Sequence, residues 1–197
     1  MRTEFNQVIK ELSIPKRESE TLFERIIECY SESHRDYHNL RHIREMLECL
    51  NTYKEAIHEY PLIYLACLYH DIVYDTHAAD NEEKSADYLE RDFKEYLAKE
   101  KVEKCKDLIL GTKKHQFLRD DFANKIFLDS DLLILGRERT RYIEYMDSIR
   151  KEYEWVEKEL YKQERTKVLQ KFLERERIYF TNEIFQKHEK QARENIK

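Results

Sequence analysis

Four residues with metal-ligating side chains occur in predominantly apolar, helix-forming stretches of this sequence. They are His42, the adjacent pair His70-Asp71, and Asp131. A charged side chain such as Asp71 at the end of an apolar helix is costly unless it is paired or binds a metal. Imidazole nitrogens together with carboxylate oxygens suit Mn, Fe, Co, Ni or Zn, and Mg is compatible with the carboxylates. These residues therefore indicate a divalent-metal site built from segments that are distant in sequence.

Two of these positions have a competing neighbour. His38 precedes His42 by one turn of a helix predicted over residues 37–50, so the two imidazoles share one face. Either is a candidate first ligand. Asp129 and Asp131 compete in the same way for the last position, and the one that does not ligate is a candidate to orient a ligand imidazole.

The stretch that carries His70-Asp71 is a long unbroken apolar segment. It starts at Pro61, a residue compatible with the first turn of a helix, and continues from Leu62 to Leu68 without a charge. Such a run predicts a buried helix. Because adjacent helical residues point about 100° apart, an ion shared by His70 and Asp71 must lie in a groove between helices.

Further helices are predicted on both sides of these segments. Apolar spacing and helix-start residues place them at residues 1–12, from Pro15 to about Tyr30, from Asp80 onward, at 101–115 and at 119–135, with three charged amphipathic helices in 137–197. Asp80 with Glu83 resembles a capping box, and Gly136 is expected to end its helix in the left-handed conformation. The run 31–36 is predicted to be a polar connection.

Composition supports an all-α fold. The chain of 197 residues contains two Gly and two Pro, and 39% of its residues are charged, which favours long helices over strands and tight turns. We expect one domain over 1–197, since no linker is evident. The four Cys form no C-x-x-C pair, and Cys29, Cys49 and Cys67 are expected to be buried, reduced thiols.

The same composition bears on partners and compartment. A net charge of −5 argues against a dedicated nucleic-acid surface, although it allows a local basic pocket for one small anion. No signal peptide and no apolar run of about 20 residues is present, so no membrane contact and a cytoplasmic location are expected. The charged helices in 137–197 leave a homodimer open, because periodicity alone does not separate it from packing within one chain.

The ordered ligand candidates resemble the signature of the HD-domain superfamily of metal-dependent phosphohydrolases. That signature is a lone His, an adjacent His-Asp pair and a distant Asp, which here are His42, His70-Asp71 and Asp131. The likeness, which covers about residues 30–175, is closest to a small group of predicted HD phosphohydrolases. It rests on the phrases at 37–42, 70–74, 81–86 and 129–132. The resemblance favours His42 over His38, and Asp131 over Asp129, as ligands.

The resemblance also implies a helical bundle with a central site for one divalent ion and specific site residues. The ion would activate a water and polarise a phosphoryl oxygen. Asp71 would accept a proton from that water while ligating the ion, and Glu82 or Glu83 is a further candidate general base. His115 and Lys114, with Lys113, would contact phosphate, or His115 would hold a second metal; His38 would face the substrate.

The resemblance thus predicts hydrolysis of a phosphate monoester or diester, with a nucleotide or similar small phosphate as substrate. Two alternatives belong to other classes. One is a regulatory or ligand-binding module that keeps the metal and hydrolyses nothing. The other is a helical interaction protein in which the polar residues form only a buried network. Metal content and turnover distinguish the three.

Overall fold

Helices are the only regular elements of the chain in the computed structural model, which describes residues 1–197. The α-helices are α1 (Arg2–Glu11), α2 (Lys16–Cys29), α3 (Leu40–Thr52), α4 (Tyr60–Tyr69), α5 (Asn81–Phe93), α6 (Lys99–Thr112), α7 (Phe122–Leu132), α8 (Arg139–Glu152), α9 (Lys158–Leu173) and α10 (Asn182–Ile196). Short 3-10 turns, η1 (Lys54–Ala56) and η2 (Leu133–Gly136), follow α3 and α7. The predicted all-α fold class is confirmed.

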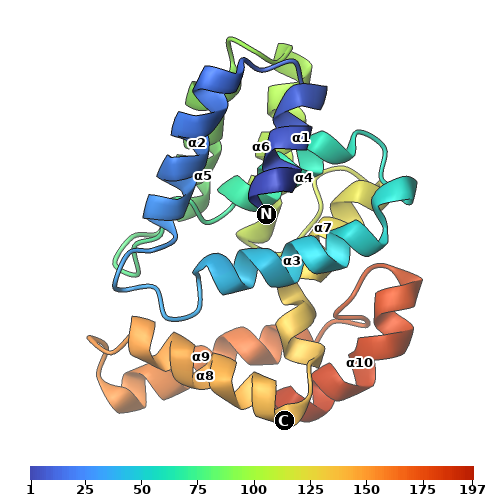
Figure 1. The fold of residues 1–197 in the computed structure, drawn as a ribbon. Coiled ribbons are helices and arrows are strands. Elements are labelled where there is room, and N and C mark those ends of the chain that lie inside the picture. The colour runs from blue at the N-terminus through green and yellow to red at the C-terminus, as the bar shows by residue number, and fades with distance from the viewer.

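Helix α3 lies between two groups of helices (Figure 1). On one side are α1, α2, α4, α5 and α6, and on the other are α8, α9 and α10. Helix α7 packs against α3, and the chain passes from α7 through η2 into the second group. The metal-ligand candidates lie on α3, at the end of α4 and on α7, so the groups meet where these helices converge.

The apolar run of α4 is the centre of the core, as its composition predicts. Every residue from Leu62 to Tyr69 is buried, and the helix packs against α1, α3, α5, α6 and α7. One continuous cluster of 49 buried apolar residues extends from Phe5 in α1 to Ala192 in α10. The two groups of helices therefore share one core. No helix combines the length and the apolar character needed to cross a membrane.

Several predicted helix ends are wrong, and two of these errors concern site residues. Helix α3 begins at Leu40, because the Asn39 side chain caps it by accepting a hydrogen bond from the Arg41 N–H. His38 is therefore outside the helix and does not share a helical face with His42. Helix α6 ends at Thr112, which leaves His115 in the following turn.

Two predicted terminal motifs are also wrong. The Asp80 side chain does not cap α5 and instead pairs with Lys84, while Glu83 pairs with Lys113. Gly136 has no positive φ. A Cβ at Gly136 would lie 2.7 Å from the Cβ of His188 and 2.7 Å from the Tyr179 hydroxyl, so the close approach of α10 requires this glycine.

The thiol prediction holds with one change. All four cysteines are free, and Cys49 and Cys67 are buried, whereas Cys29 is only half-buried at the end of α2.

Candidate metal centre

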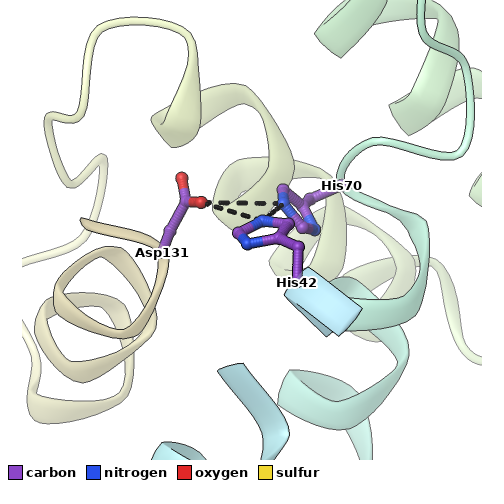
Figure 2. A group of neighbouring side chains, drawn as sticks. All are labelled: His42, His70 and Asp131. Atoms are coloured by element: carbon purple, nitrogen blue, oxygen red, sulfur yellow. Dashed lines mark hydrogen bonds and ion pairs between the residues drawn. The ribbon is translucent and has the colours of Figure 1, made fainter. Parts of the chain in front are cut away.

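Three helices bring His42, His70 and Asp131 together. His42 lies in the first turn of α3, His70 directly follows α4, and Asp131 lies near the end of α7. Figure 2 shows both imidazoles and the carboxylate directed toward one another. One ligand atom from each residue lies within 4.8 Å of the others. The predicted convergence of these segments is therefore present in the structure.

The separations between the ligand atoms fit the edges of a coordination polyhedron. The Nε2 atoms of His42 and His70 are 3.1 Å apart, and His42 Nε2 lies 3.2 Å from Asp131 Oδ1. His70 Nε2 lies 3.8 Å from the same oxygen. Ligands bound about 2.1 Å from an ion are separated by about 3.0–3.4 Å when they are neighbours around it. Two of the three separations lie in this range, so the group is close to the spacing that a divalent cation requires.

Asp71 supplies a fourth candidate ligand atom. Its Oδ2 lies 3.0 Å from His70 Nε2 and 3.8 Å from His42 Nε2. Both imidazoles are buried, whereas Asp71 and Asp131 keep part of their side-chain surface exposed. The carboxylates thus form the accessible side of an otherwise buried site.

The surroundings of His70 prepare its Nε2 to act as a ligand. Its Nδ1 lies 2.9 Å from the Cys67 carbonyl oxygen, which only accepts, so Nδ1 carries the hydrogen. The neutral tautomer then has its lone pair on Nε2, toward the cluster. Burial alone lowers the pKa of His70, but Asp71 and Asp131 outweigh it and raise the pKa to about 9. The site therefore favours a positive charge at this point.

The two carboxylates are held in their charged forms. Burial acts to raise the pKa of Asp71, yet the adjacent His70 outweighs it and brings the pKa well below its usual range. The pKa of Asp131 is also far below normal, because hydrogen bonds from His115 and His42 overcome the effect of burial. Anionic ligand atoms are thus available across the neutral pH range.

His115 orients Asp131 from outside the cluster. Its Nε2–H donates to Asp131 Oδ2 at 2.9 Å, which leaves Oδ1 directed at the two imidazoles. The backbone at His115 has φ 47°, in the left-handed region that non-glycine residues rarely adopt. Local strain of this kind is typical of functional sites. The structure therefore places His115 beside a candidate ligand, in the turn after α6.

Asp129 lies outside the cluster and does not orient an imidazole. Its carboxylate is fully buried and accepts hydrogen bonds from the backbone N–H groups of Phe180 and Thr181 and from the Thr181 hydroxyl. It fixes the loop before α10 to α7. The expectation that Asp129 orients a ligand imidazole is wrong, because its carboxylate is bonded to Phe180 and Thr181 and to no histidine.

His38 is held at the cleft by Glu152 at the end of α8. The Glu152 carboxylate accepts from the backbone N–H groups of Tyr37 and His38, from His38 Nδ1 at 2.7 Å and from the Tyr74 hydroxyl at 2.8 Å. Burial acts against ionisation of both partners, but their mutual attraction raises the pKa of His38 and lowers that of Glu152 to about 2. Glu152 thus favours the charged form of His38 beside the cluster, while His42 belongs to the cluster itself.

A buried arginine fixes the turn that presents Asp71. The Arg35 guanidinium donates to the carbonyl oxygens of His38, Asp71 and Ile72, at 3.2, 2.6 and 3.0 Å. Only 6% of Arg35 is exposed. It therefore ties the segment before α3 to the segment after α4. The prediction that residues 31–36 form only a polar connection missed this role.

A cleft of about 810 Å³ opens beside the cluster. Asp71, Asp131, His38, His115 and Lys114 contribute to its walls. A volume of this size is typical of small-molecule sites. The carboxylate side of the cluster thus faces a space large enough for a substrate.

The candidate bases at the start of α5 differ in position. Glu82 lines the cleft, whereas Glu83 does not and is bonded to Lys113 Nζ at 2.5 and 2.6 Å. The hydrogen bond from Lys113 lowers the pKa of Glu83, which makes that carboxylate a weaker base. The structure therefore keeps Glu82 at the site and engages Glu83 and Lys113 with each other.

Sequence reasoning missed Arg35 and Glu152 because both stand in charged surroundings typical of solvated surface. Glu152 is separated by more than 110 residues from the His38 that it binds, so no local spacing indicates the contact.

Comparison of the chain with protein-family models, with curated proteins and with solved structures finds no match.

Proposed function

We propose that this protein is a metal-dependent phosphohydrolase that acts on a small phosphate ester, with a nucleotide as the first class to test. The observation that carries the proposal is the convergence of His42, His70, Asp71 and Asp131, with imidazole–imidazole and imidazole–carboxylate separations of 3.0–3.8 Å and with both carboxylates lining a cleft. The order of these residues along the chain resembles the HD-domain superfamily, which adds the reaction class.

The residues of the cluster would have different roles in this reaction. A bound divalent ion would supply a Lewis acid that lowers the pKa of water and polarises a phosphoryl oxygen. His42 and His70 would each offer Nε2 to the ion after losing any proton held there, and Asp131, oriented by His115, would offer an oxygen ligand. Asp71 is placed both to ligate and to accept a proton, because its carboxylate lies at the cluster and lines the cleft.

Groups around the cluster supply positive charge and a further base. His38, whose charged form Glu152 favours, lines the cleft and is suited to contact a phosphoryl oxygen. Glu82 is the remaining candidate base, since it lines the cleft while Glu83 pairs with Lys113. Charge-assisted contacts of this kind favour the dianionic phosphate over a neutral ligand.

The proposal is tested by turnover. The purified full-length protein is assayed against a panel of nucleotides, sugar phosphates and an aryl phosphate, with Mn, Fe, Co, Ni, Zn or Mg added in turn. The same panel is run with Asp131→Asn and with Asp87→Asn, a control at an aspartate whose side chain is 76% exposed. We expect hydrolysis by the wild type and by the control, and a loss of at least about a hundredfold in Asp131→Asn.

Absence of turnover with every metal and every phosphate would contradict the hydrolase proposal. If the metal were nevertheless retained, a ligand-binding or regulatory role for the same site would replace it.

A further inference from the structure

Four cationic side chains line the cleft and form no ion pair with a carboxylate. They are Lys114, Arg165, Lys171 and Arg175. Lys113 provides the contrast, because its ammonium group is bonded to Glu83 and lies 3.7 Å from Glu82. Three of these positive charges lie on or just after α9: Arg165 and Lys171 belong to the helix, and Arg175 follows shortly after its last residue. None of the three is neutralised by a carboxylate.

Arg165 is the most confined of these cations. Its guanidinium carbon lies 5.2 Å from the centre of the Tyr145 ring, and one terminal nitrogen donates to the Tyr145 hydroxyl. Its Nε is buried and has no hydrogen-bond partner. A buried donor without a partner costs about 1–3 kcal/mol. The chain itself does not satisfy this guanidinium.

Arg175 has the same character. Its Nη2 donates to the Lys114 carbonyl oxygen at 2.9 Å, while its Nη1 is buried without a partner. The guanidinium lies 4.8 Å from the centre of the Phe172 ring. Burial lowers the pKa of Arg175 and no carboxylate acts against this effect. Both arginines therefore place a positive charge beside an aromatic ring, and each has one buried N–H donor without a hydrogen-bond partner.

An aromatic layer separates these arginines from the metal-ligand cluster. Between Arg165 and His42 stand Tyr145 and Tyr37, whose ring centres are 4.6 Å apart. Tyr37 in turn lies 5.0 Å from the His42 ring. On the other path, the Phe172 ring lies 5.6 Å from His115, which binds Asp131. The arginines and the cluster therefore line different parts of the cleft.

We infer that the part of the cleft lined by Arg165 and Arg175 is a second anion site, which binds phosphate groups apart from the metal-ligand cluster. Guanidinium groups bind phosphate oxygens by paired, charge-assisted hydrogen bonds. Apolar side chains such as Leu135, Ile149 and Val168 also line the cleft and suit an uncharged part of the ligand. A statement about the substrate rests on the proposed hydrolase function. If that function holds, the substrate carries two separate phosphate groups, one at the metal-ligand cluster and one at the arginines.

The anion site is tested without metal or turnover. Binding of inorganic diphosphate to the full-length, chelator-treated protein is measured by isothermal titration calorimetry. The comparison includes Arg165→Gln/Arg175→Gln and a charge-matched control, Lys162→Gln/Lys190→Gln, at exposed positions of α9 and α10. We expect stoichiometric binding by the wild type and the control, and binding weaker by at least about tenfold in the arginine variant.

Equal affinity in all three proteins, or no binding of diphosphate by the wild type at millimolar concentration, would overturn the inference. Arg165→Gln and Arg175→Gln are also made as single variants, and circular dichroism checks that each is folded. If one of them does not fold, the affinity of the other for diphosphate still tests the inference. Metal content measured on the same variants separates this result from the hydrolase proposal: the arginine variants are expected to retain the ion, whatever the outcome with diphosphate.

Discussion

At the scale of single residues, the candidate site depends on side chains that hold the candidate ligands as well as on those ligands themselves. His115 donates one hydrogen bond to Asp131 Oδ2, and Arg35 donates three to the carbonyl oxygens of His38, Asp71 and Ile72. Neither residue contributes an atom to the His42, His70 and Asp131 group. Their substitution should therefore alter the geometry of a site that keeps all its ligands.

We predict that His115→Ala weakens metal binding by about 10–100-fold, because Asp131 loses the donor that orients it. His115→Asn should lose less, since Asn tolerates the left-handed backbone at this position and retains a donor. The measurement is a competition titration with a metal chelator of known affinity. Equal affinity of the wild type and His115→Ala would contradict an orienting role and leave His115 as a cleft residue only.

Arg35→Gln is predicted to lower the free energy of unfolding by about 3 kcal/mol, because three buried or partly buried carbonyl oxygens lose charged donors. Urea unfolding measures this value, with the exposed Arg44→Gln as control. A change no larger than that of the control would show that the buried guanidinium does not hold these segments together.

At the scale of elements, two carboxylates fasten the second group of helices to the rest of the fold. Glu152 joins the end of α8 to the segment before α3, and Asp129 joins α7 to the loop before α10. The cleft is lined both by the ligand candidates Asp71 and Asp131 and by residues of α9. The ion pair of His38 and Glu152 thus positions one wall of the site.

The Glu152 contact gives a pH-dependent stability with a definite sign. The folded-state pKa of about 2 lies below the ordinary value of 4.5, so the contribution is present above pH 4.5 and is lost as the pH falls toward 2. It amounts to about 3 kcal/mol. We predict that Glu152→Gln is less stable than the wild type at pH 6 and that the difference shrinks between pH 4.5 and 2.

Urea unfolding of the two proteins across this pH range, with the exposed Glu154→Gln as control, makes the comparison. A stability difference that stays constant from pH 6 to pH 2 would be inconsistent with a charged Glu152 in the folded protein.

The elements also show where sequence reasoning succeeds. The uncharged run from Leu62 to Leu68 predicts a buried helix, and every residue of this run is buried in α4, because a segment without a polar face has no stable position at the surface. The sequence predicts helix ends less well. Because the Asn39 side chain caps α3, the helix begins after His38. The Asp80 carboxylate pairs with Lys84 and does not cap α5, and nothing in the sequence pattern indicates which of these two partners it takes.

At the scale of the whole molecule, the ligand candidates could be predicted from residue type and order, whereas their supporting contacts could not. His42, His70 and Asp131 stand out because each is polar on an apolar helix. Arg35, Glu152 and Arg165 do not stand out, because charged residues on amphipathic helices and turns are usually solvated. Arg35 finds its partners in the segments before α3 and after α4, whereas Glu152 and Arg165 gain theirs through the packing of α8 and α9 at the cleft.

The central claim is that three helices assemble one divalent-metal site, and metal content tests it most directly. The full-length protein is equilibrated with Mn, Fe, Co, Ni, Zn or Mg, dialysed against metal-free buffer at matched pH, and analysed by elemental mass spectrometry. It is compared with a His70→Ala/Asp71→Ala variant and with His58→Ala, whose side chain is 93% exposed. The account predicts about one ion per chain in the wild type and in His58→Ala, and none in the double variant. Failure of the wild type to retain any of these ions, or equal retention by the double variant, would contradict it.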